Sequence, residues 1–169
     1  MFDIRDGEVR LAEDPAARSP DAGLVFVGTI RSPWIDRADC PKNMAAARAA
    51  GRPATLLVDE AYRPGLAGLE GTSHVVILTF LQHAPRDLIV QRPRHATEPR
   101  GVFSLRSPAR PNPIGLHVAR LLSLDLAAGL LGLDAIDVLD GTPVVDLKPY
   151  LPATDAFPDA VKPASHASE

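Results

Sequence analysis

The sequence predicts a mainly β fold: a small antiparallel β-barrel with few short helices, formed as a single domain. Three observations support this prediction. The 169-residue chain is 46% hydrophobic, which is enough for one globular core. Its apolar residues fall into short runs separated by Gly, Pro, Asp and Ser, as in strands joined by turns. Helical patterns are few and do not alternate with the strands, which favours an antiparallel barrel or sandwich over a parallel sheet.

An extension is predicted at residues 1–22, before the barrel begins. Residues 2–11 alternate apolar and polar side chains on both sides of an Asp-Gly turn, which is a hairpin signal. Residues 14–22 are rich in Pro, Ala, Asp and Ser and are predicted to be a linker. The barrel domain is then expected over 23–152, and a flexible tail rich in Pro, Ala and Ser over 153–169.

Within the barrel domain, the elements are predicted from period-two alternation and from turn residues. Strands are expected at 24–31, 54–59, 73–82, 88–92, 101–105, 114–126, 130–138 and 143–148. A helix is expected at about 42–50 and a helical turn near 64–69. Alternation is clearest in 114–126, where one face is predicted to carry Ile114, Leu116, Val118, Leu122, Leu124 and Leu126. The opposite face is predicted to carry Gly115, His117, Ala119, Ser123 and Asp125.

Composition excludes several classes of protein. No apolar run is long enough to span a bilayer, and the N-terminus lacks the basic and apolar regions of an export signal. The one cysteine, Cys40, cannot form an internal disulfide and suits a reducing compartment, so a cytoplasmic protein is expected. The five histidines lack metal-ligand spacing, and no P-loop or dinucleotide motif occurs, so no metal site is expected.

The distribution of charge is more informative than its sum. The net charge is −3, yet 15 of the 18 basic residues are arginine. Segment 86–120 holds seven arginines against only Asp87 and Glu98, a local net charge of +5. A polyanion such as RNA would be attracted to such a segment. An arginine-rich solvated surface would give the same pattern, so charge alone leaves both interpretations open.

The segment 106–116, RSPARPNPIGL, is the most distinctive in the chain. Its three prolines fix φ and remove backbone donors, so neither a helix nor a central strand can continue through it. Arg110 and Asn112 both precede a proline and are held in extended geometry. This proline-constrained ribbon is predicted to present Arg106, Arg110 and Asn112 in fixed directions. The alternative is a structural turn between two strands.

A second polar cluster follows in DGTPVVDLKPY, residues 140–150. An Asp-Gly turn opens it, and alternation places Asp146 and Lys148 on one face of the next strand. An acid, a base and the phenol of Tyr150 could form a site there. An ion pair on a solvated strand would explain Asp146 and Lys148 equally well.

Together these pieces resemble a known family. VGTIRSPW (27–34), GLEGTSHVVIL (68–78), GVFSLRSPARPNPIGL (101–116) and DGTPVVDLKPYLP (140–152) occur in the order and spacing of the TsaA/TrmO-type tRNA (adenine-N6)-methyltransferases. DCPKN at 39–43 is similar to the cofactor loop of the shorter members. The resemblance covers about 24–152. It implies a homodimeric β-barrel that binds S-adenosylmethionine without a Rossmann fold and methylates the exocyclic nitrogen of threonylcarbamoyl-adenosine 37 in tRNA.

The resemblance also implies which residues form the site. The cofactor contacts fall on Pro41, Lys42, Asn43, Gln82, His83, Arg106, Leu116, Ile136, Asp137, Val138 and Leu139. The substrate-side and catalytic candidates are Arg110, Asn112, Asp146, Lys148 and Tyr150. Larger bacterial members carry a C-terminal domain that helps to engage tRNA, whereas this sequence ends about 17 residues after Pro152. Two alternatives therefore stay open: methylation of a small molecule or another RNA by the same fold, and a non-catalytic binding protein.

Overall fold

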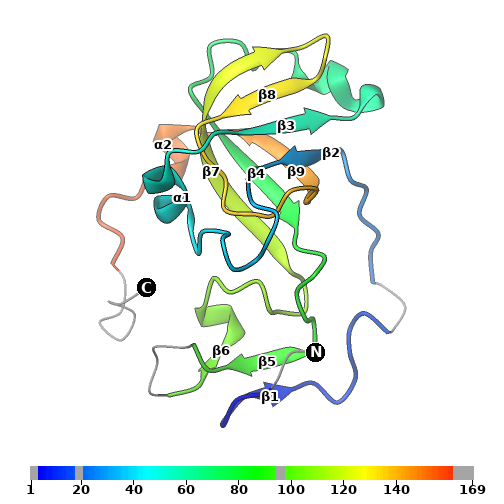
Figure 1. Cartoon of the computed structure of the whole chain (residues 1–169), viewed down its shortest axis with the longest axis vertical. Coiled ribbons are helices and arrows are strands. Elements are labelled where there is room, and N and C mark those ends of the chain that lie inside the picture. Colours follow the sequence, from blue (N-terminus) through cyan, green and yellow to red (C-terminus); the bar gives the residue numbers. More distant parts are fainter. Residues whose placement is uncertain (1–3, 18–20, 94–97, 162–169) are drawn as a thin grey trace.

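The computed structural model describes residues 4–17, 21–93 and 98–161 and consists of a barrel with a smaller sheet beside it (Figure 1). The barrel is closed by six strands that all pair antiparallel, in the order β2-β3-β8-β7-β4-β9. The strands are β2 (Gly28–Arg31), β3 (Ala54–Val58), β4 (His74–Phe80), β7 (Ile114–Asp125), β8 (Leu130–Leu133) and β9 (Pro143–Pro149). The predicted antiparallel barrel is confirmed.

The smaller sheet lies below the barrel in the view of Figure 1 and has the strand order β1-β5-β6. Its strands are β1 (Val9–Arg10), β5 (Leu88–Gln91) and β6 (Arg100–Gly101). A short 3-10 helix, η2 (Val102–Ser104), leads from β6 into the proline-constrained ribbon. The predicted extension therefore contributes a strand to the lobe that carries the ribbon.

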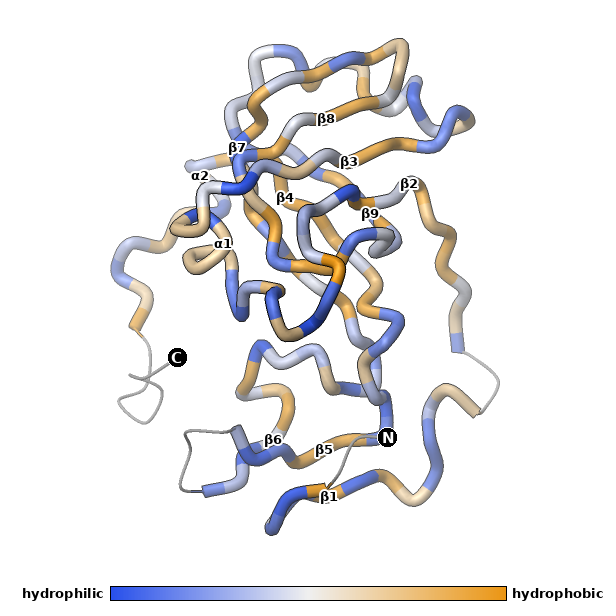
Figure 2. The backbone as a smooth tube through the Cα atoms, in the orientation of Figure 1, coloured by the Kyte–Doolittle hydropathy of each residue, from blue (hydrophilic) through white to orange (hydrophobic). Residues whose placement is uncertain are grey.

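The core fills the barrel with aliphatic side chains from alternate positions of its strands. Ile30, Leu56, Ile77, Leu131 and Val144 are fully buried there. Figure 2 shows hydrophobic residues along the barrel strands and also in the segment just before β2. In that segment the side chains of residues 24–26 are exposed, so its hydrophobicity does not belong to the core.

Two helices, α1 and the 3-10 helix η1, flank the barrel, and a third, α2, follows its last strand. Helix α1 (Met44–Ala50) is alanine-rich; Asn43 caps it by accepting from the Ala46 amide, and Gly51 ends it at φ 63°. The predicted turn near 64–69 is a longer 3-10 helix, η1 (Glu60–Leu66). A single helical turn, α2 (Pro152–Asp155), follows β9, and residues 151–161 are exposed.

Three predicted strands are shorter than expected. The 24–31 strand forms only at Gly28–Arg31: residues 24–26 are exposed, and Val27 joins the barrel through backbone bonds to Val144 and Asp59. The 101–105 strand is replaced by η2 after Gly101, since the chain turns into the ribbon. The 130–138 strand ends at Leu133, and residues 134–139 leave the β3 edge to run beside β7.

The predicted N-terminal hairpin is wrong in its pairing. The Asp-Gly turn forms, with Gly7 at φ 77° and the Glu8 amide bonded to the Arg5 carbonyl. However, residues 4–5 are not a strand, and β1 pairs with β5 in place of the preceding segment. Phe2, which the alternation included, lies outside the described residues. Partner and register came from a distant strand, which local alternation cannot encode.

The predicted single face of 114–126 is also divided. The small-residue face at Gly115, His117 and Ala119 points into the barrel, and Ile114 and Leu116 point outward. A register shift between Leu121 and Ser123 then exchanges the faces. As a result Leu124 and Leu126 pack against the core whereas Leu122 is exposed.

No helix within the described part of the chain is long and apolar enough to cross a membrane.

Candidate functional site

The site is built where β7 has a free edge. Over residues 114–120 the strand pairs with β4 on one side, but β8 joins its other side only from Leu121. The Leu116 and Val118 carbonyls on that edge accept instead from Arg106, at 3.1 Å, and from Arg48 of α1. The ribbon and α1 are thereby attached to the same open edge.

The 134–139 segment lies along the same edge. It begins with a two-way contact in which the Asp134 amide donates to the Arg120 carbonyl and the Asp134 carboxylate accepts from the Arg120 amide. Asp134 also pairs with Arg48 at 3.4 Å. These contacts hold the predicted cofactor segment, Ile136 to Leu139, beside β7.

The RSPW motif fastens this segment from its other side. The buried Trp34 indole donates to the Ile136 carbonyl at 2.7 Å, and the Ser32 hydroxyl donates to the Val138 carbonyl at 2.8 Å. The Asp140 carboxylate accepts from the Ser32 amide, and the Asp140 amide donates to the Trp34 carbonyl. Four hydrogen bonds therefore fix the backbone conformation of 136–140.

A buried polar cluster lies behind Asp137. Its carboxylate contacts His117 Nδ1 at 2.6 Å, and His117 Nε2 is 2.9 Å from the hydroxyl of buried Thr79. The same carboxylate affects Cys40, which lies in the loop before α1. Burial raises the pKa of the Cys40 thiol, and the negative charge of Asp137 adds to this effect, so that the pKa is about 11. The predicted cofactor loop and the 136–139 segment are thus neighbours.

The remaining predicted cofactor residues lie in the loop before α1 and in the turn after β4, and most of them are exposed. Pro41 is half-buried and Lys42 exposed, and Asn43 uses its side chain to cap α1. Gln82 and His83 are exposed in the turn that follows β4. The adjacent Leu81 amide bonds to the Pro113 carbonyl, so this turn lies at the end of the ribbon.

The ribbon is held by arginines. Arg110 folds back and donates to the Leu105 and Ser107 carbonyls at 3.1 and 3.4 Å. Arg86 donates to the Pro111 carbonyl at 2.7 Å and to the Asn112 side chain at 3.4 Å. Asn112 is exposed. The guanidinium of Arg110 therefore stabilises the fold of the ribbon by hydrogen bonds to its backbone.

The second substrate group lies on β9. Lys148 Nζ is 2.7 Å from Asp146 Oδ2 on the outer face of the barrel, so the ion-pair interpretation holds for these two residues. Tyr150 lies edge-on to His74, and its amide bonds to the His74 carbonyl. Since His74 begins β4 and the ribbon meets β4 at its end, Tyr150 and the ribbon are about 20 Å apart along that strand. Within one chain Tyr150 is therefore far from the ribbon, whereas Asp146, which pairs with Leu78, lies nearer to the end of β4 that the ribbon meets.

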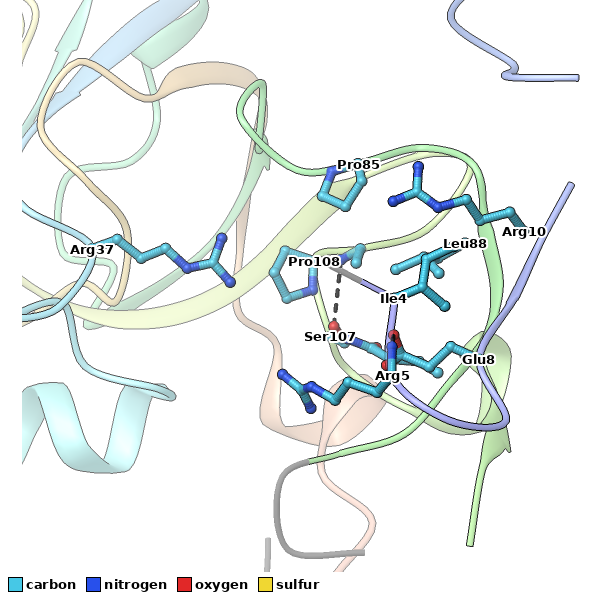
Figure 3. A pocket seen from close by; sticks show the side chains of 11 residues that line it. Ile4, Arg5, Glu8, Arg10, Arg37, Pro85, Leu88, Ser107 and Pro108 are labelled. Carbon is cyan, nitrogen blue, oxygen red and sulfur yellow. Dashed lines mark hydrogen bonds between the residues drawn. The ribbon is translucent and has the colours of Figure 1, made fainter. Parts of the chain in front are cut away.

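A small cavity of about 60 Å³ separates the extension from the ribbon (Figure 3). Ile4, Arg5 and Glu8 line one side of it, and Ser107 and Pro108 the other. The extension and the first turn of the ribbon therefore face each other across this cavity. No group of three or more potential metal ligands occurs among the residues that the structure describes.

Sequence reasoning missed five residues that build the site: Arg48, Trp34, Arg86, His117 and Thr79. The signal for Trp34 was its place in the RSPW motif. His117 stood among small residues on one face of a strand, a pattern that suits the crowded inside of a small barrel. Arg48 and Arg86 act on distant carbonyls and left no local signal.

Comparison with known proteins shows to which family this antiparallel barrel belongs. The family model for the tRNA-methyltransferase O N-terminal domain matches residues 29–156. The chain belongs to the TrmO family.

Individual relatives support this assignment. A probable S-adenosyl-L-methionine-binding protein, VirR of Rhizobium radiobacter, is 37% identical over 146 residues, 86% of this chain and 79% of the relative. The tRNA (adenine(37)-N6)-methyltransferase of Escherichia coli is 36% identical, over 79% of this chain and 60% of that enzyme.

Solved structures give the same result. A crystal structure of TrmO from Pseudomonas aeruginosa superposes with a TM-score of 0.66 at 33% identity, over 86% of this chain and 63% of that one. Another TrmO structure gives a TM-score of 0.70 at 36% identity, over 85% and 64%. The chain thus spans slightly less than two thirds of the solved structures that it matches.

Proposed function

We propose that this protein is an S-adenosylmethionine-dependent methyltransferase that methylates N6 of threonylcarbamoyl-adenosine at position 37 of tRNA. The observation that carries the proposal is the open edge of β7. There Arg106, Arg48 from the helix that follows the cofactor loop, and Asp137 of the 136–139 segment, which are far apart in sequence, all contact one strand. Membership in the TrmO family supplies the reaction class.

The donor side of the site follows from its hydrogen bonds. When bound, S-adenosylmethionine supplies a sulfonium methyl group that an in-line nucleophile takes with loss of the thioether. The residues proposed to hold it are Pro41 to Asn43, Gln82, His83, Arg106, Leu116 and Ile136 to Leu139. Because the 136–139 backbone is fastened before any ligand arrives, little ordering cost remains for binding.

The acceptor side would use the ribbon and β9. Arg110 offers a planar guanidinium suited to the carboxylate of the threonylcarbamoyl group, and Asn112 offers an exposed amide beside it. Asp146 would accept the proton that leaves N6, while Lys148 holds one of its oxygens. Tyr150 would complete this group.

Tyr150 lies at the far end of β4 from the ribbon, so it can meet Arg110 and Asn112 only if a second chain contributes one of the two groups. We therefore propose a homodimer through the outer face of β4 and β7. Three apolar cross-strand pairs form that face: Val76–Val118, Leu78–Leu116 and Phe80–Ile114. The ring of Phe26 extends it beside Phe80, 5.7 Å away. A two-fold axis through this face would bring one chain's ribbon toward its partner's β9.

Light scattering tests the dimer. We expect twice the 18.0 kDa mass of one chain, and a single-chain mass for Ile114→Glu. Leu130→Glu is the matched control, since Leu130 is equally exposed, at 39% against 40%, but lies on β8. A single-chain mass for the unaltered protein, with and without S-adenosylhomocysteine, would refute the dimer.

The activity is tested by mass spectrometry of tRNA nucleosides from cells with and without the gene, complemented by wild type or Arg110→Lys. We expect one methylated threonylcarbamoyl-adenosine to disappear on deletion and to return only with wild type, because lysine keeps the charge but lacks the planar fork. Unchanged tRNA nucleosides would refute this substrate. An enzyme that modifies tRNA works where tRNA is, so we place it in the cytoplasm.

A further inference from the structure

Burial of the polar residues His117 and Thr79 inside the barrel costs free energy, and the packing of the core does not require these residue types. His117 is 4% exposed and Thr79 fully buried, among aliphatic side chains. A buried imidazole is tolerated only when its ring nitrogens are satisfied, and an apolar residue would pack the same space without that requirement. The cluster therefore calls for a role beyond packing.

The ring of His117 has a defined orientation. Its Nδ1 faces the Asp137 carboxylate at 2.6 Å, so Nδ1 carries a proton and donates to Oδ1. Its Nε2 faces the Thr79 hydroxyl, which donates to it when the ring is neutral. The two contacts fix the rotation of the imidazole and, through it, the direction of the Asp137 carboxylate.

The PNPIG motif leaves room for this arrangement. A Cβ at Gly115 would lie 2.4 Å from Thr79 Oγ1 and 2.5 Å from His117 Nε2. Any side chain there would displace the pair, although Gly115 has no positive φ that would require glycine. The motif glycine thus serves the histidine as well as the ribbon.

Asp137 connects the cluster to the proposed cofactor site. Its neighbours Ile136 and Val138 are buried and fastened by RSPW, whereas its own side chain reaches the surface and is 15% exposed. It also lies close enough to the cofactor loop for its charge to act on Cys40. The carboxylate therefore stands between the barrel interior and the proposed ligand.

We infer that His117 is a positioning residue for cofactor binding: it holds the Asp137 carboxylate in the orientation in which that group meets the adenosyl ligand. Thr79 supports the ring and has no direct share in the contact. This inference rests on the proposed function for the identity of the ligand. It assigns His117, which no ligand would touch, a measurable effect on affinity.

Three substitutions separate the contact of His117 with Asp137 from its contact with Thr79. The amide nitrogen of His117→Asn can replace Nδ1 and still donate to Asp137, whereas the longer amide of His117→Gln reaches the Nε2 position and Thr79. Thr79→Val removes the hydroxyl and leaves Nδ1 in place. A merely structural role predicts similar effects for all three variants.

The dissociation constant for S-adenosylhomocysteine is measured by calorimetry, with thermal unfolding alongside. We expect His117→Gln to bind at least about tenfold more weakly, and His117→Asn and Thr79→Val to stay within about threefold of wild type, although all three melt earlier. In an Asp137→Ala background, His117→Gln should have no further effect on affinity, because His117 acts through Asp137.

Wild-type-like affinity in His117→Gln, equal losses in all three variants, or additive losses with Asp137→Ala would each overturn the inference. If His117→Gln does not fold, His117→Leu takes its place, since it also removes the donor to Asp137: binding weaker than in Thr79→Val supports the inference, and binding equal to Thr79→Val overturns it. Failure of the wild-type protein to bind S-adenosylhomocysteine would refute the proposed function instead, so the two failures are distinguishable.

Discussion

Substitution of Trp34 by Phe should weaken both the fold and cofactor binding. The Trp34 side chain is 5% exposed, and its indole N–H is the hydrogen-bond partner of the fully buried Ile136 carbonyl. Phenylalanine fills most of the same space but leaves that carbonyl without a donor. An unsatisfied buried acceptor costs about 1–3 kcal/mol, so Tm should fall by about 2–12 °C for a chain of this length.

The affinity for S-adenosylhomocysteine should fall in the same variant, because the 136–139 backbone loses one of its attachments. The matched control is Arg52→Ala. Arg52 Cζ lies 4.9 Å from the Trp34 ring centroid, so its loss removes a contact worth about 0.5–1 kcal/mol without touching Ile136. Differential scanning calorimetry and titration calorimetry give the two readouts. If Trp34→Phe melts and binds like Arg52→Ala, the hydrogen bond does not hold the segment.

Three further predictions concern other parts of the structure. With a pKa of about 11, only about one Cys40 thiol in a thousand is ionised at pH 8, so iodoacetamide should label it slowly. Asp137→Asn should lower the pKa of Cys40 and speed this labelling. An unchanged labelling rate, measured by mass spectrometry, would contradict the prediction. Gly115→Ala should cost about 1–3 kcal/mol by thermal unfolding, while Gly65→Ala, with open space around its Cβ position, should cost far less. Deletion of residues 1–13 removes β1 and should make the remainder of the smaller sheet, β5 and β6 with the ribbon, sensitive to limited proteolysis while the barrel stays intact. Simultaneous digestion of both parts would show that they do not unfold separately.

Much of the barrel was predictable because its signals are local. Alternation placed β3, β4 and β9 to within about two residues, and the helix expected at about 42–50 forms as α1. The N-terminal hairpin failed because strands choose their partners from distant parts of the chain. The sequence of the extension shows a hairpin, yet the unpaired edge of β5 supplies a better partner through the Arg10–Asp87 ion pair.

The site was predictable in part for the same reason. Its motifs could be recognised from residue types, but the contacts that join them cross the fold, such as Arg48 to the Val118 carbonyl. The bulge after Leu121 is a further example, because period-two alternation continues through it in the sequence and reverses in space.

In the proposed site, the open edge of β7 takes the place of a nucleotide-binding βαβ unit. A closed barrel has no unpaired backbone, and its narrow interior has no space for an adenosyl group. By letting β8 pair only with the far half of β7, the chain frees carbonyls on the near half, which Arg106 and Arg48 then occupy. The segment released from β8 returns along the same edge, fastened by Trp34. A shorter pairing in one hairpin thus creates the edge, and the segments that attach to it carry the proposed cofactor residues.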